Sequence, residues 1–298
     1  MPAMSGLRSS QFWKHALGKS AGLFLLLAVL APGMATPAAP QATPEDGGKG
    51  IVREIVDGDT LVIEMTEAAK GTAVSGTPDI AKPGSQIQIR LVGIQAPKLA
   101  LGRPNFKPWP LAEESKAALS ELAMNRTLRL SFGGQKIDRH GRLLAQLYRD
   151  DGLWIQGEMI GRGMARVYTF ADNRMFADDL YKREREARQA TRGIWSDPFY
   201  AVRKPEQMGD EVGSFQLVEG QIRSAAVVHS RGFLNFGDDW KKDFTAMIDP
   251  SAQALFRRAK IDIAALEGKR VRLRGWVSFY RRPEIEITHP EQIEVLEP

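Results

Sequence analysis

Hydrophobic and polar residues alternate in short runs along the first half of the chain, which is the pattern of half-buried β-strands. These runs predict strands at residues 51–56, 60–65, 85–93, 126–132 and 143–148. Apolar residues at helical spacing predict helices in the same part of the chain, at residues 111–124, 154–161 and 172–192. Residues 50–198 are therefore predicted to form a mainly β domain with helices.

A second β-rich region follows a segment with prolines, glycines and charges at residues 199–213, which we predict to be a linker. Its runs predict strands at 215–222, 227–236, 243–248, 270–278 and 285–288, with one helix at 251–266. Three strands, a helix and two more strands are the element order of a five-stranded Greek-key barrel of the OB type. We therefore predict a second, smaller OB-like barrel at residues 214–298.

The N-terminus has a different pattern, in which three basic residues and no acidic residue precede an apolar run at residues 21–30. This run is shorter than the roughly 20 apolar residues of a membrane span. Small residues around Ala35 favour a signal peptide at residues 1–35, with an uncleaved anchor as the alternative. Residues 36–49 are rich in proline, alanine and glycine, and we predict a flexible spacer there. We thus expect an exported protein, periplasmic or secreted, without a stable membrane span after cleavage.

The composition excludes several kinds of chemistry. The chain contains no cysteine, so it has no disulfides, no thiolate nucleophile and no lipid-modified cysteine. Its content of 43% hydrophobic and 26% charged residues is that of a globular protein. The formal net charge of +5 includes three basic residues of the predicted signal peptide. The remaining mild positive charge permits binding to nucleic acid but does not require it.

Three short polar segments adjoin the predicted strands and offer the groups of a phosphate site. Asp57 and Asp59 flank a glycine in a turn, Arg90 lies in a strand, and Arg142 follows a second turn. Carboxylates are the preferred ligands of hard divalent cations, and guanidinium groups bind two phosphate oxygens at once. Taken singly, each has a simpler interpretation: a hairpin turn for the two aspartates, an ion pair for Arg90 and a solvated turn residue for Arg142.

Together these segments resemble the thermonuclease family, the relatives of staphylococcal nuclease, over about residues 50–198. The resemblance rests on Val-Asp-Gly-Asp-Thr at 56–60, on Ile-Arg-Leu-Val-Gly-Ile-Gln-Ala-Pro at 89–97 and on Asp-Arg-His-Gly-Arg at 138–142. Glu-Arg-Glu-Ala-Arg followed by Gly-Ile-Trp, within 184–195, completes it. The family fold is an OB-type barrel with three helices, so the resemblance implies that fold here.

The resemblance also implies roles for individual residues. Asp59 matches a calcium ligand of the family, and Asp57 matches its acidic neighbour. Arg90 and Arg142 match two arginines that bind phosphate and act in catalysis. By the same carry-over, calcium is the expected cofactor.

The chain departs from the family at the end of its third strand. The family has an Asp-Ala/Thr-Pro-Glu pattern there, whose Asp binds calcium and whose Glu is the general base. This chain has Gln95 and Lys98 at those two positions. Glutamine offers only a neutral oxygen, and a protonated lysine has no lone pair to accept a proton from water. We therefore expect calcium binding to be weak and calcium-dependent hydrolysis to be impaired.

Glu113 and Glu114 are possible substitute bases, although a helix dipole favours acidic residues in a first turn anyway.

Aromatic residues provide further candidate binding positions. Tyr168 and Phe170 match family aromatics beside the nucleotide base, and core packing is the alternative. In the second region, basic and aromatic side chains interleave at Trp240, Lys241, Lys242, Arg270, Arg272, Arg274, Trp276, Tyr280, Arg281 and Arg282. This composition suits a nucleic-acid-binding barrel face. However, 13 basic and 15 acidic residues follow Pro205, so a structural or protein-contact role is the alternative.

The sequence thus predicts an exported thermonuclease-like protein that binds nucleic acid, either DNA or RNA, or another phosphorylated ligand. The ligand would bind the retained pocket of arginine and aspartate side chains. Two alternatives remain open: an active phosphodiesterase that uses altered chemistry, and a non-enzymatic interaction module of the cell envelope.

Overall fold

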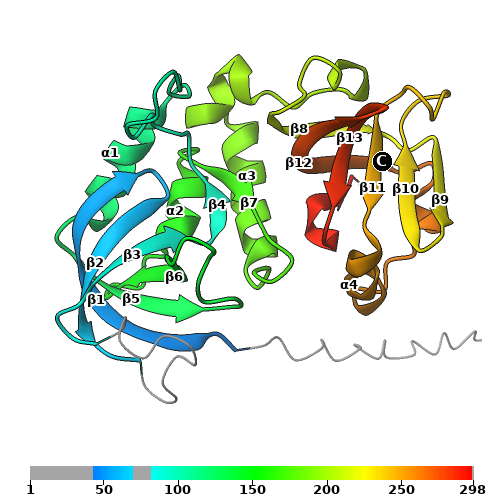
Figure 1. Cartoon of the computed structure of the whole chain (residues 1–298). Helices are drawn as coiled ribbons and strands as arrows, with labels where there is room; N and C mark the ends of the chain where they lie inside the picture. The colour runs from blue at the N-terminus through cyan, green and yellow to red at the C-terminus, as the bar shows by residue number, and fades with distance from the viewer. Residues whose placement is uncertain (1–42, 70–81, 297–298) are drawn as a thin grey trace, which may run out of the picture. The chain divides into compact units, whose positions relative to one another are not determined.

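Five strands close into a barrel in the first part of the chain (Figure 1). They are β1 (Glu45–Asp57), β2 (Thr60–Glu67), β3 (Gln86–Leu91), β5 (Thr127–Phe132) and β6 (Leu143–Arg149). Their order is β1-β2-β3-β6-β5, and only β3 and β6 run parallel. The alternating pattern directs every second side chain inward, so that Leu61, Ile63 and Ile89 are fully buried.

This computed structural model describes residues 43–69 and 82–296. The predicted signal peptide and the first half of the predicted spacer, residues 36–42, lie outside these residues. Strand β1, however, begins at Glu45, so the prediction of a flexible spacer was wrong for residues 45–49. This part of β1 pairs with β5, and Gly48 has a φ of +79° at a shift of register. A Cβ on Gly48 would lie 2.2 Å from the carbonyl oxygen of Glu67. The glycine that suggested flexibility is therefore required for a β-bulge.

Three helices and a small sheet complete the first domain. The helices are α1 (Ala112–Ala123), α2 (Ile155–Gly161) and α3 (Ala177–Gln189), and β4 (Gly93–Gln95) pairs with β7 (Arg166–Tyr168). Apolar residues from the barrel and from all three helices form one core. Helix α3 begins five residues later than predicted, because the chain first turns back at Asn173, whose N–H donates to the oxygen of Phe170.

The segment at residues 199–213, predicted to be a linker, packs onto the second sheet. It contains short 3₁₀ helices at Pro198–Tyr200 and Pro205–Gln207. Met208 is fully buried in the second core. The backbone of Arg203 exchanges hydrogen bonds with Leu217 and Glu219. The described residues accordingly belong to one compact unit.

The second sheet has seven strands. They are β8 (Phe215–Gln221), β9 (Ser224–Val228), β10 (Arg231–Asn235), β11 (Thr245–Ile248), β12 (Arg270–Tyr280), β13 (Arg282–Ile287) and β14 (Ile293–Val295). The single strand predicted at 227–236 is instead the hairpin of β9 and β10, because His229 and Ser230 both adopt positive φ in a tight turn. The predicted helix at 251–266 is shortened to α4 (Gln253–Arg258), and Lys260 at a φ of 57° prevents its continuation.

The second sheet repeats the strand order of the barrel. Its path runs β8-β12-β13-β11-β10-β9, and only Ile222 and Arg223 separate β8 from β9 in the chain. The parallel pair β11–β13 corresponds to the parallel pair β3–β6, and α4 lies where α1 lies in the first domain's element order. The predicted fold class, mainly β with an OB-type barrel and helices, is confirmed. Among the described residues no helix is long and apolar enough to cross a membrane.

Arg274 connects the second sheet to the first domain. Its side chain is 1% exposed, and its guanidinium pairs with Glu184 of α3 at 2.9 Å and donates to the oxygen of Val167 at 3.1 Å. On the same strand, Arg270 and Arg272 pair with Glu219. These three arginines, considered from sequence as a basic binding surface, therefore hold ion pairs within the protein.

Candidate functional site

Two buried carboxylates lie side by side at the tight turn between β1 and β2. Asp59 is 0% exposed and Asp57 is 4% exposed. The N–H of Asp59 donates to Oδ1 of Asp57 at 3.0 Å, which fixes the turn. Between them, Gly58 packs against α1, since a Cβ there would lie 2.0 Å from Oγ of Ser115. The Asp-Gly-Asp motif thus has two functions in the fold: its glycine allows the turn to pack closely against α1, and its aspartates form the carboxylate pair.

The ammonium group of Lys98 lies against both carboxylates. Its Nζ is 2.6 Å from Oδ2 of Asp59 and 3.4 Å from Oδ2 of Asp57. Arg90 adds a second cation, 3.4 Å from the same oxygen of Asp59. Burial by itself would raise the pKa of Asp59, but Arg90 and Lys98 outweigh burial and hold that pKa well below its usual range. Burial and the neighbouring Asp59 raise the pKa of Asp57, and Lys98 opposes this rise.

Gln95 stands at one of the two positions that depart from the family pattern, and it is hydrogen-bonded to a buried arginine. Its Oε1 accepts hydrogen bonds from Nε and Nη2 of Arg166, at 3.0 and 2.8 Å. Arg166 also donates to the backbone oxygen of Phe215 in β8, at 3.2 Å, and lies over the Phe215 ring. Burial lowers the pKa of Arg166 to about 10. The side-chain oxygen of Gln95 is therefore an acceptor for a buried guanidinium inside the protein.

The residues present do not fit the calcium ion that the resemblance implies. Calcium takes 6–8 oxygen ligands, mainly carboxylates and carbonyls, at roughly 2.3–2.6 Å. Here Lys98 is already paired with the two carboxylates, and the oxygen of Gln95 is bonded to Arg166. Within residues 43–69 and 82–296, no group of three or more His, Cys, Asp and Glu side chains is arranged to hold a metal.

The two candidate phosphate-binding arginines lie in different surroundings. Arg90 donates to the backbone oxygens of Leu91 and Ile94, which fixes its guanidinium above Asp59. Arg142 instead forms an ion pair with Asp138 of its own loop, in which Nε at 2.7 Å and Nη2 at 2.6 Å both contact Oδ2 of Asp138. The structure thus brings Arg90 together with the carboxylate pair and gives Arg142 a local partner.

The candidate substitute bases lie in the first turn of α1. Glu113 and Glu114 are both exposed there. This is the position at which the helix dipole favours acidic side chains, so their placement has a structural explanation that requires no role in catalysis.

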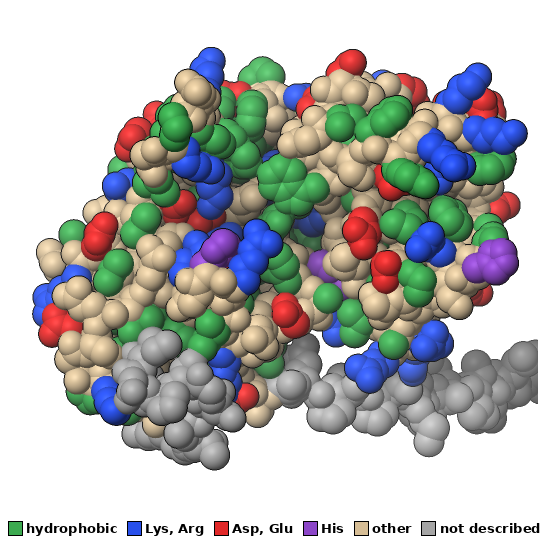
Figure 2. Space-filling model, in the orientation of Figure 1, with side chains coloured by type: hydrophobic (Ala, Val, Ile, Leu, Met, Phe, Trp, Pro, Cys, Tyr) green, Lys and Arg blue, Asp and Glu red, His purple; other side chains and the backbone are tan. Residues whose placement is uncertain are grey.

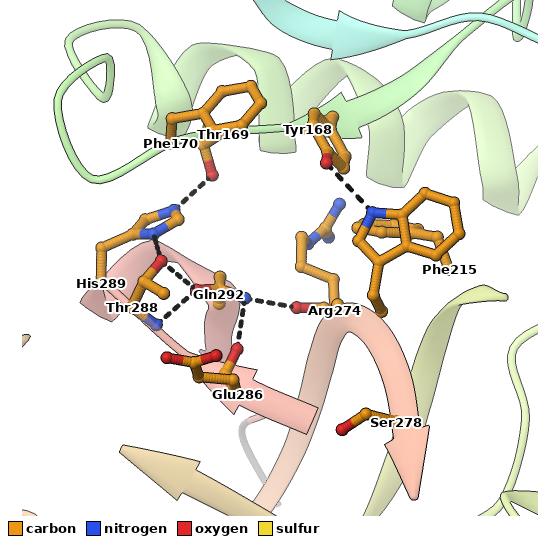
Figure 3. A pocket seen from close by; sticks show the side chains of 12 residues that line it. Tyr168, Thr169, Phe170, Phe215, Arg274, Ser278, Glu286, Thr288, His289 and Gln292 are labelled. Atoms are coloured by element: carbon orange, nitrogen blue, oxygen red, sulfur yellow. Dashed lines mark hydrogen bonds between the residues drawn. The ribbon is translucent and has the colours of Figure 1, made fainter. Parts of the chain in front are cut away.

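Tyr168 and Phe170 line a cavity of about 310 Å³ between β7 and the second sheet (Figure 3). The Tyr168 ring packs edge-on against Phe170, with centroids 4.9 Å apart, and its hydroxyl accepts the indole N–H of Trp276 at 3.1 Å. Phe215 contacts both Tyr168 and Trp276. Phe170 and Trp276 are each 46% exposed, so these rings are not sealed into a core. Tyr168 is the register partner of Gly93 in β4, and the residue that follows β4, Ala96, donates its N–H to Asp59.

The opposite side of this cavity is lined by polar side chains that form hydrogen bonds with one another and with the backbone. His289 is buried between the hydroxyls of Thr169 and Thr288, at 2.8 and 2.9 Å from its ring nitrogens. Gln292 donates to the backbone oxygens of Arg274 and Glu286. Trp276 was a candidate from the sequence, whereas His289, Phe215 and Arg166 were not. The one available signal was the charge of Arg166 directly before the apolar residues of β7.

Charged side chains of both signs are interspersed over the face shown in Figure 2. Attraction of an anionic ligand to this face would therefore depend on particular arginines rather than on a broad positive field.

Comparisons with known proteins agree with the motifs. The family model described as staphylococcal nuclease homologue matches residues 88–197. An uncharacterized endonuclease of Escherichia coli is 30% identical over 148 residues, covering 50% of this chain and 77% of that protein. The thermonuclease of Staphylococcus hyicus is 24% identical over 151 residues, covering 49% of this chain and 75% of that protein.

A further relative is covered to a smaller share of its own length. An endonuclease derived from the SPbeta prophage of Bacillus subtilis is 31% identical over 142 residues, which is 47% of each chain. The present chain therefore spans about half the length of that relative.

Proposed function

The chain belongs to the staphylococcal nuclease homologue family, and on that premise we propose that it binds single-stranded nucleic acid, or another phosphorylated ligand, with impaired calcium-dependent hydrolysis. Nuclease relatives support the nucleic-acid class of ligand. The N-terminal pattern further supports export to the periplasm or the medium.

The observation that carries the binding proposal is the open aromatic cavity between β7 and the second sheet. Phe170 and Trp276 have half-exposed rings, and both contact Tyr168. Every nucleobase has a π-face, so stacking on such rings tolerates any sequence and contributes about 1–3 kcal/mol per base. Arg142 would contact the phosphate backbone of the same strand, because its guanidinium is only partly covered and its pair with Asp138 is solvent-accessible.

The impairment of hydrolysis follows from Lys98 and Gln95. Attack on a phosphodiester needs a base that accepts a proton from water. Lys98 is protonated in its ion pair with Asp59, so it has no lone pair for this step. The retained arginines would still stabilise charge on a bound phosphate, but they supply neither a base nor a metal-bound water. Binding without rapid cleavage is the expected result.

The test is an anisotropy titration of the full chain with fluorescent single-stranded DNA and RNA, with and without calcium, followed by electrophoresis of the oligonucleotides. We expect binding that weakens with salt and oligonucleotides that stay intact. Rapid calcium-dependent digestion would overturn the impairment, and no binding of either polymer at low salt would overturn the binding proposal. The assay also tests the alternative of altered chemistry. Cleavage that persists unchanged in Arg142→Ala would identify a contaminating nuclease.

A further inference from the structure

Two neighbouring carboxylates inside a protein require a compensating positive charge. Asp57 and Asp59 are almost completely buried, and a hydrogen bond joins them through the Asp59 backbone. A buried carboxylate that lacks a partner loses its hydration without replacement, and two adjacent ones also repel each other. The source of the compensating charge therefore decides how this turn is stabilised.

The Oδ2 atoms of both aspartates face the same ammonium group. Lys98 donates to Asp59 at 2.6 Å and to Asp57 at 3.4 Å, which is the arrangement of one cation between two carboxylates. The Asp59 carboxylate also accepts hydrogen bonds from the N–H of Ala96 at 2.8 Å and the hydroxyl of Thr60 at 3.1 Å, which are both neutral donors. Among the described residues, the other cation beside this carboxylate is Arg90, at 3.4 Å.

The backbone on both sides of Lys98 is fixed in this position. The N–H of Ala96 binds Asp59 itself, and the oxygen of Lys98 accepts the N–H of Trp109 at 2.9 Å. The Lys98 side chain is 22% exposed, so most of it is covered by protein. A surface lysine that forms an ion pair by chance would have neither the fixed backbone nor the covered side chain.

We propose that the Lys98 ammonium is the resident cation of this carboxylate pair and replaces a divalent metal in holding the turn. This role of Lys98 is separate from impaired hydrolysis: the ammonium stabilises the turn and makes the pocket independent of calcium. It does not depend on nucleic-acid binding. A calcium ion could enter only by displacing the ammonium, and it would then lie beside Arg90.

The test compares the melting temperature Tm of the full chain with variants at this position, in chelator and in millimolar calcium. We expect the wild type to show the same Tm in both. Lys98→Ala removes the ammonium and opens space, so its Tm should fall by roughly 6–20 °C in chelator, as for other broken buried ion pairs. Calcium should then raise the Tm of this variant, and calorimetry should detect binding of calcium alone.

Three further variants separate this role from ordinary packing. Lys98→Arg keeps the charge and should remain stable and insensitive to calcium. Lys98→Met fills the space without charge, so it should lose stability that calcium does not restore. Lys49→Ala removes a lysine from an exposed pair with Glu67 and should change neither property.

A double-mutant cycle provides a test that does not require Lys98→Ala to fold. The fall in Tm of the combined Asp59→Asn, Lys98→Met variant should be smaller than the sum of the falls of the two single variants. Each single change leaves the other charge buried without its partner, and the double change does not. Additive losses, or calcium binding to the wild type as tight as to Lys98→Ala, would overturn the proposal.

Discussion

Gln95 accepts two hydrogen bonds from Arg166, and Arg166 in turn donates to the backbone oxygen of Phe215. The position at which the family resemblance implies a calcium ligand is therefore part of a contact between β4, β7 and the second sheet. A buried guanidinium requires an acceptor at this point, because burial already lowers its pKa to about 10. Gln95 supplies that acceptor without adding a third carboxylate near Asp57 and Asp59.

Substitution of Gln95 should accordingly affect stability rather than metal binding. Gln95→Asp gives Arg166 a charged partner, so we expect an unchanged or higher free energy of unfolding and no response to calcium. Gln95→Leu leaves the guanidinium without a side-chain acceptor and should cost about 1–3 kcal/mol of unfolding free energy. Urea unfolding of both variants, with and without calcium, measures these effects. A calcium-dependent gain in Gln95→Asp would show that its carboxylate faces the aspartate pair instead.

Arg142 and its partner Asp138 should change nucleic-acid binding in opposite directions. Arg142→Ala removes one phosphate contact, so affinity for single-stranded DNA should fall and the slope of log K against log salt should shrink by about 0.7. Asp138→Asn releases the guanidinium from its ion pair, and affinity should rise. The asparagine oxygen still accepts the N–H groups of His140 and Arg142, so the turn is retained. Anisotropy titrations at several salt concentrations test both changes, and a fall in both variants would contradict the role assigned to Arg142.

The aromatic cavity predicts which rings contact bases. Replacement of Tyr168 or Trp276 by alanine should weaken binding of single-stranded DNA by roughly 5- to 150-fold, the effect of losing one stacked base. Phe199→Ala is the matched control, since Phe199 is similarly exposed but contacts Trp109 and Tyr200 outside the cavity. Equal effects of all three substitutions would indicate general destabilisation, which the Tm of each variant would reveal.

The sequence was sufficient for features that depend on local pattern. Alternating side chains predicted the barrel strands, and Asp57-Gly58-Asp59 predicted the turn that the structure contains. The errors arose where a local signal had a long-range cause. Gly48 suggested a flexible spacer, yet the bulge that needs this glycine exists only because β1 lies against β2 and β5.

The composition of the candidate site could not be predicted in the same way. Lys98 was identified as an unsuitable base, but its pairing with Asp59 joins residues 39 positions apart. The pairs of Arg166 with Gln95 and of Arg274 with Glu184 span 71 and 90 positions. Charged residues in a strand indicate polarity without indicating a partner, so Arg274 was considered as part of a binding surface when it is buried.

The pair of Arg274 and Glu184 should be a major contribution to the attachment of the second sheet. Arg274→Met leaves buried Glu184 with Arg188, at 3.7 Å, as its remaining cation among the described residues, and should cost about 3–5 kcal/mol of unfolding free energy. Adding Glu184→Gln removes the uncompensated charge and should recover part of that loss. The unfolding free energies of the single and double variants test this coupling. A double variant less stable than Arg274→Met alone would contradict it.

His289 should make stability depend on pH below neutrality. Burial, together with Arg174 and Arg274, lowers the pKa of His289 from 6.5 to about 4. As the pH falls below 6.5 the unfolded chain binds a proton on this residue, while the folded chain does not until about pH 4. The stability contributed by the neutral, buried His289 is therefore complete above pH 6.5 and is lost progressively as the pH falls to 4. The free energy of unfolding falls by about 3 kcal/mol in total over this window, and this residue causes no further change below pH 4. His289→Gln keeps a hydrogen-bonding side chain without this titration, so the stability difference between wild type and variant should change by that amount across the window. Unfolding in urea at a series of pH values measures the stability of wild type and variant, and parallel profiles for the two would exclude a neutral buried His289.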